Sequence, residues 1–89
     1  MITRDSLMEW ILEALSEAGG EGSVVDVSKH VWKHHERDLR MAGDLFYTWQ
    51  YDLRWAAKRL RDLGRLTPVE NQRGLPWTIA DKKKSPKLS

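Results

Sequence analysis

Residues 43–64 read GDLFYTWQYDLRWAAKRLRDLG, the longest segment of the chain with a helical period. Its apolar side chains recur at spacings of four, three, four and three residues, which places them on one stripe of an α-helix. The stripe consists of Trp49, Leu53, Ala56, Leu60 and Leu63. Gly64 is expected to adopt the left-handed conformation that ends many helices. We therefore predict a long helix over Asp44–Leu63, with Asp44 or Thr48 capping its first amides.

The opposite arc of this helix is aromatic and basic, with Tyr51, Arg54, Trp55, Lys58 and Arg61. Such a face can pack on a partner or lie along nucleic acid. Trp55 could contact DNA or pack beneath the C-terminal segment near Trp77. Packing is favoured, because a small domain needs its large aromatic side chains for core area. The same argument places the remaining tryptophans in the core or at its edge: Trp10, Trp32, Trp49 and Trp77.

The chain has 89 residues and no cysteine, which indicates one small domain with no disulfide framework and no cysteine-based zinc site. It has no apolar signal run at its start and no apolar segment long enough for a membrane helix. We therefore expect a cytoplasmic protein with no membrane partner.

Charge is segregated along the chain, although the net charge is only +2. Residues 1–26 carry one base against six acids, residues 27–80 carry ten bases against six acids, and residues 81–89 carry four lysines against one acid. Residues 1–80 are expected to form the folded domain, and residues 81–89 a disordered basic tail. The asymmetry fits one face that meets a polyanion, or a mixed surface that segregated without function.

Two shorter helices are predicted before the long one. Residues Ser6–Ala18 show a wide apolar arc. Ser23 and Asp26 have the spacing of a capping box, which should open a second helix that runs to about His35. Between these helices, residues 21–24 are long enough for a link or a stub of strand.

The segment Glu36–Gly43 connects the second helix to the long one. It is highly charged, with Leu39 and Met41 as its sizeable apolar side chains. We expect a further helical turn or a loop, anchored by these two residues.

The C-terminal part of the domain is predicted to be a β-hairpin. Its strands are Arg65–Val69 and Leu75–Ile79, joined by the polar tip ENQRG at residues 70–74, which carries Arg73. Together with three helices this order gives a mainly α fold with a small hairpin (α+β), the order of a winged helix-turn-helix with a two-stranded wing.

Short motifs spread over about residues 6–80 also resemble the N-terminal domain of Mrr-type restriction proteins. They are LRWA at 53–56, Leu60, LGRL at 63–66, RGLPWTI at 73–79 and GGEGS at 19–23. The resemblance implies a winged-helix DNA-binding module, a regulatory or targeting part of a restriction-type system. This chain departs from the family in lacking a nuclease part and in having Pro76 inside the second wing strand, so the resemblance gives no ground for cleavage.

Docking of a helix-turn-helix sends the N-terminal part of the recognition helix into the major groove. Arg54 could then read guanine and Gln50 adenine, whereas Lys58 and Arg61 would reach phosphates. The full set expected to contact double-stranded DNA is Tyr47, Thr48, Gln50, Tyr51, Arg54, Lys58, Arg61 and Arg73. The alternative is a protein-interaction module of the same fold, with a homodimer as its expected form.

The histidines at positions 30, 34 and 35 are candidates for a metal site. His30 and His34 have the i, i+4 spacing of a two-histidine pair, but the sequence offers no obvious third ligand. We expect no metal or other cofactor, and histidines that face solvent or phosphate. Since no phosphate loop, serine elbow or carboxylate cluster is present, we also expect no enzymatic activity and no small-molecule substrate.

Overall fold

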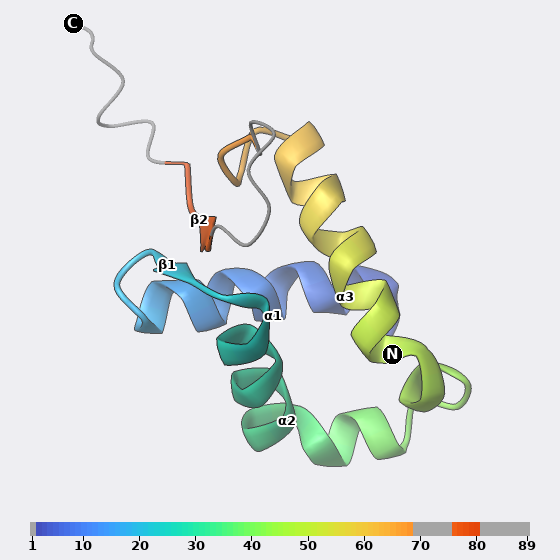
Figure 1. Ribbon diagram of the computed structural model, residues 1–89. Helices are drawn as coiled ribbons and strands as arrows, with labels where there is room; N and C mark the ends of the chain where they lie inside the picture. Colours follow the sequence, from blue (N-terminus) through green and yellow to red (C-terminus); the bar gives the residue numbers. More distant parts are fainter. Residues whose placement is uncertain (1, 69–75, 81–89) are drawn as a thin grey trace, which may run out of the picture.

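The computed structural model describes residues 2–68 and 76–80. Within these residues, three helices and two short strands follow in the order α1 (Arg4–Glu17), β1 (Glu21–Gly22), α2 (Val24–Arg40), α3 (Leu45–Asp62) and β2 (Trp77–Thr78). Figure 1 shows α1 running across both other helices, with the small sheet at the end where α1 and α3 finish. The predicted mainly α fold with a small β component is therefore confirmed. The expected tip at residues 70–74, including Arg73, and the expected tail at 81–89 lie outside the described residues.

The predicted capping box opens α2. The Ser23 hydroxyl accepts the Asp26 N–H at 3.0 Å, and the Asp26 carboxylate accepts the Ser23 N–H at 3.4 Å. Helical conformation breaks at His35, where the prediction ended, and then resumes to Arg40. In this extra segment Leu39 is fully buried and anchors the connection, but Met41 is 80% exposed and the prediction that it is an anchor was wrong.

Helix α3 confirms the long helix predicted from its apolar stripe. Trp49, Leu53, Ala56 and Leu60 of that stripe are buried. Leu63 is not, because the helix has ended and Gly64 turns the chain with a φ of +77°. Leu63 is consequently 53% exposed and leaves the stripe.

The start of α3 also differs from the prediction. Asp44 occupies the N-cap position, but its side chain makes no capping hydrogen bond. The Thr48 hydroxyl instead donates to the Asp52 carboxylate at 2.7 Å. Neither expected side-chain cap is therefore formed.

The sheet joins segments that are far apart in the sequence. Strand β1 pairs with β2 in antiparallel register, with Glu21 opposite Thr78 and Gly22 opposite Trp77. Of the two alternatives expected before α2, a link or a stub of strand, the structure shows the strand, but its partner was not foreseen. A further hydrogen bond, from the Ile79 N–H to the Gly20 carbonyl at 2.8 Å, extends the pairing.

The predicted hairpin is present in reduced form. Leu66 forms a single antiparallel bridge with Ile79, and the Thr67 N–H donates to the Thr78 carbonyl at 2.9 Å. Among the described residues of the expected strand Arg65–Val69, which are residues 65–68, only Leu66 pairs in this way, and no longer strand forms. Segment 77–79 consequently lies between the segments around residues 21–22 and 66.

The core lies where the three helices and the sheet meet. Its fully or nearly fully buried side chains are Leu7, Ile11, Leu15, Val27, Val31, Leu39, Leu53, Leu60 and Leu66. Trp10, Trp49 and Trp77 are buried and Trp32 is half-buried, as predicted. Trp55 also packs against the core, but beside the first turn of α1, where the Arg4 guanidinium lies 4.1 Å from its ring centroid.

Candidate nucleic-acid interface

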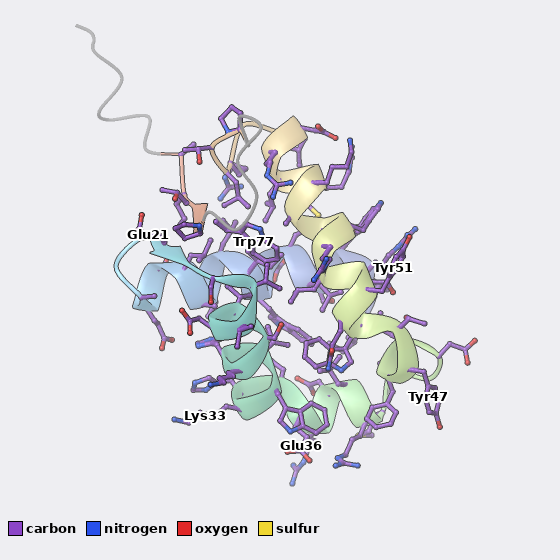
Figure 2. All side chains as sticks on the ribbon, in the orientation of Figure 1. Glu21, Lys33, Glu36, Tyr47, Tyr51 and Trp77 are labelled. Carbon is purple, nitrogen blue, oxygen red and sulfur yellow. The ribbon has the colours of Figure 1, made fainter. Side chains whose placement is uncertain are left out.

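The outward surface of α3 is a stripe of aromatic, amide and basic side chains at spacings of three and four residues. It comprises Tyr47, Gln50, Tyr51, Arg54, Lys58 and Arg61, and is called the α3 face below. Tyr47 and Tyr51 are 82% and 78% exposed. Figure 2 shows both pointing away from the body of the molecule. Two large aromatic side chains left this exposed on one helix are a departure from ordinary burial and indicate a surface for contact.

The basic side chains of the α3 face remain accessible. Gln50, Arg54 and Lys58 are exposed, and Arg61 is half-buried. Within residues 2–68 and 76–80, Arg54 makes no ion pair, whereas Lys58 Nζ lies 3.5 Å from Asp62 Oδ2. That pair is exposed and therefore weak, so it leaves the Lys58 ammonium able to meet another anion.

The structure gathers six of the eight residues predicted to contact DNA. Thr48 is exposed, and its hydroxyl donates a hydrogen bond to the Asp52 carboxylate. Arg73 lies outside the described residues. The α3 face therefore comprises six of the eight predicted residues, and the DNA contacts expected of Thr48 and Arg73 stay predictions.

A groove between α2 and α3 adjoins the α3 face and was missed by sequence reasoning. Its volume is about 560 Å³, and its lining comprises Val24, Val25, Ser28, Lys29, Trp32, Phe46, Trp49, Gln50 and Arg54. Trp32 stacks on Trp49 with ring centroids 6.1 Å apart. The signal for this groove was the surplus of aromatic side chains at the start of α3, but only the packing of α2 against α3 brings them together with Trp32.

A second polar cluster joins α1 and α2. Glu13 accepts from two histidines: one carboxylate oxygen lies 3.0 Å from His30 Nε2 and the other 3.2 Å from His35 Nε2. His35 also stacks on Trp10, with ring centroids 4.0 Å apart. The exposed fractions of the His30 and His35 side chains are 13% and 16%. The expectation of solvent-facing histidines was therefore wrong for these two, because α1 presents Glu13 to them.

A third ligand for the His30–His34 pair is also present. The potential ligand atoms of Glu17, His30 and His34 all lie within 4.8 Å of one another. The sequence held a signal for this, since Glu13 and Glu17 have the same i, i+4 spacing on α1 as the two histidines on α2. What the sequence could not supply was the crossing of the two helices.

Electrostatics within the cluster favour the ionised carboxylate of Glu13. Burial by itself raises the pKa of this carboxyl, but the hydrogen bonds and charges of His30 and His35 outweigh it, and the net pKa is lower than usual. A depressed folded-state pKa stabilises the fold above the ordinary glutamate value of 4.5, and this stabilisation is lost as the pH falls below it.

Replacing Glu13 with glutamine is expected to lower the free energy of unfolding by about 1 kcal/mol at neutral pH, because two charge-assisted hydrogen bonds are weakened in a partly solvated site. The difference from the wild type should shrink as the pH falls through the folded-state pKa of Glu13. Urea denaturation at a series of pH values measures it. A difference that stays constant down to acid pH would contradict the assigned role of the carboxylate.

Comparison of the chain with models of protein families, with curated proteins and with solved structures found no match. Within the part of the chain that the structure describes, no helix combines the length and the apolar character needed to cross a membrane.

Proposed function

We propose that this chain is a winged helix-turn-helix module that binds double-stranded DNA through the α3 face. The observation that carries the proposal is the α3 face itself, with exposed Tyr47, Tyr51 and Arg54 on one side of a long helix. A regular helix of this length with one uncovered polar and basic side fits the width of the major groove of B-DNA.

The arrangement of the elements supports the winged-helix part of the proposal. A recognition helix in this fold follows two other helices and is followed by a hairpin. Here α3 is third in order, and the bridge between Leu66 and Ile79 closes a hairpin directly after it. The short strand β1 lies between α1 and α2 and adds to the outer side of β2.

Each residue of the α3 face then has a distinct task. Arg54 and Gln50 can read base edges, because a guanidinium matches guanine and a carboxamide matches adenine in the major groove. Tyr47 and Tyr51 can contact thymine methyl groups or phosphates, and Lys58 can contact phosphates further along the helix. The resemblance to Mrr-type N-terminal domains agrees with a targeting role.

A salt titration of DNA binding tests this function. Fluorescence anisotropy with a random duplex of about 20 base pairs should show affinity that falls steeply as salt rises from about 50 to 200 mM. Lys58→Ala should weaken binding to all sequences and reduce the salt slope by about one. Arg54→Ala should weaken binding by about 1 to 3 kcal/mol and relax sequence preference, once a preferred site has been selected.

Two controls separate the folded domain from generic attraction. A chain that ends at Ala80 removes four lysines, and the salt slope should survive this deletion if the α3 face makes the contacts. All titrations contain a chelator, so that divalent metal plays no part. Unchanged affinity in both α3-face variants would overturn the proposal and favour a protein-interaction module.

A further inference from the structure

Two pairs of potential metal ligands meet where α1 crosses α2. Glu13 and Glu17 lie one turn apart on α1, and His30 and His34 lie one turn apart on α2. The rings of the two histidines are neighbours, with centroids 4.3 Å apart. This cluster is not used by the proposed DNA contact, which lies on α3.

Three residues of the cluster, Glu17, His30 and His34, lie close enough together to bind one ion. The potential ligand atoms of Glu17, His30 and His34 are at most 4.8 Å apart. A tetrahedral zinc site with bonds of about 2.1 Å holds its ligands about 3.4 Å from one another. Glu17 and His34 are exposed, so small rotations of their side chains can close the remaining gap.

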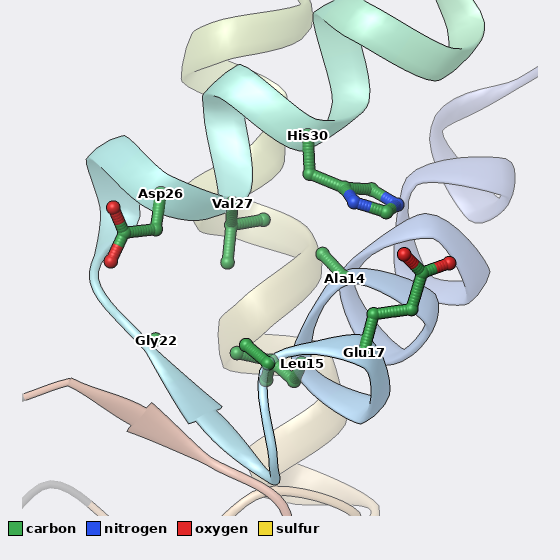
Figure 3. Close-up of a pocket in the computed structure, with 8 residues that line it drawn as sticks. Ala14, Leu15, Glu17, Gly22, Asp26, Val27 and His30 are labelled. Carbon is green, nitrogen blue, oxygen red and sulfur yellow. The ribbon is translucent and has the colours of Figure 1, made fainter.

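Access to this point is open. Figure 3 shows the Glu17 carboxylate of α1 lying across from the His30 ring of α2. A pocket of about 220 Å³, lined in part by Glu17, Val27 and His30, adjoins them. A hydrated cation can therefore reach the cluster, and one coordination position would remain for water.

Glu13 prepares His30 for this task. The Glu13 carboxylate lies 3.0 Å from His30 Nε2, and a ring that donates its Nε2–H to this carboxylate is held in one tautomer and one orientation. A carboxylate behind a ligating histidine is the usual way in which proteins fix the tautomer and raise the basicity of the ligand. Glu13 is therefore a positioning residue.

We propose that Glu17, His30 and His34 bind a first-row divalent cation, with Zn²⁺ as the best match. Two imidazole nitrogens and one carboxylate oxygen form a donor set that suits Zn²⁺ well and excludes the hard cations Mg²⁺ and Ca²⁺, which prefer oxygen. The ion would tie the C-terminal turn of α1 to α2. This site goes beyond DNA binding and does not depend on it.

Zinc affinity measured by competition with a chromophoric chelator tests the site. The protein must carry no histidine tag and is first stripped with EDTA. The wild type should bind zinc with micromolar or tighter affinity. Glu17→Gln and His34→Ala should each lower the zinc affinity by at least about 10-fold. Both variants change exposed side chains, so they are expected to fold. Cobalt(II) should give the intense visible bands of a tetrahedral ion with wild type and lose them with either variant.

Matched controls fix the assignment to these residues. Glu9→Gln and Glu21→Gln each remove an exposed carboxylate that lies outside the ligand trio. Both should keep zinc affinity close to that of the wild type. No competition by the wild type, or equal weakening by the control variants, would overturn the proposal.

The positioning role of Glu13 has its own readout. Nitrogen-15 NMR of the imidazole groups reports which nitrogen of His30 carries the proton in the metal-free protein. The wild type should hold the Nε2–H tautomer, and Glu13→Gln should lose this preference and bind zinc about 10-fold more weakly. An unchanged tautomer would show that Glu13 acts on stability alone.

Discussion

Replacing Leu53 with alanine is expected to lower the free energy of unfolding by about 3 kcal/mol. Leu53 is fully buried in the middle of α3, within the cluster that joins α1, α2 and α3. Its loss removes the transfer free energy of the side chain and leaves a cavity that rigid helices can only partly fill. A domain of this size has a total stability of about 4 to 13 kcal/mol, so a large share of it would be lost. Urea denaturation followed by tryptophan fluorescence measures the change.

Leu63→Ala is the matched control, since both leucines lie on the apolar stripe read from the sequence. Because Leu63 is 53% exposed, its truncation is expected to cost less than about 0.5 kcal/mol. Similar losses for the two variants would mean that Leu63 is part of the core and that α3 continues past its observed end.

The contrast between these two leucines shows how much of the burial of α3 could be predicted from the spacing of apolar residues. The spacing of apolar residues correctly predicted α3 and the burial of Trp49, Leu53, Ala56 and Leu60. The left-handed conformation predicted for Gly64, the glycine that follows the stripe, was confirmed. Periodicity could not predict that Leu63 is exposed. This residue is already at the helix C-cap, directly before the turn at Gly64.

The sheet was less predictable for a different reason. Strands of two residues carry too few side chains for an alternating pattern, so pairing depends on which backbone segments the helices bring together. The capping box of Ser23 starts α2 directly after Gly22, and this leaves residues 21–22 extended beside Trp77 and Thr78. Local sequence signals identified the cap and left residues 21–24 as a link or a stub of strand, and the pairing is a tertiary result.

The two candidate sites also differ in how far the sequence could predict them. The α3 face follows from one helix and its period, so the sequence located six of its residues. The sequence did not reveal that the Thr48 hydroxyl has a local partner in Asp52, one turn along. The histidine cluster depends on α1 and α2 together, and Glu13 and Glu17 look like ordinary solvated residues until the helices cross.

Reversing two charges on the α3 face is expected to have the largest effect on function. Arg54→Glu combined with Lys58→Glu should lower affinity for duplex DNA by about 100-fold or more at low salt, because two attractive phosphate or base contacts become repulsive. Both side chains are exposed, and the fold should therefore be retained. Anisotropy titration, with circular dichroism as a check on folding, measures the effect.

Lys33→Glu combined with Arg37→Glu is the control for this experiment. It makes the same change in net charge at two exposed positions of α2, and Figure 2 shows Lys33 far from the tyrosines of the α3 face. If binding depends on the α3 face, this variant should lose about 10-fold or less, through the long-range field alone. Equal losses of affinity for the two double variants would mean that DNA is attracted by the overall charge and that α3 makes no specific contact with it. A loss confined to the α3 variant would locate the contact on the helix that the sequence first singled out.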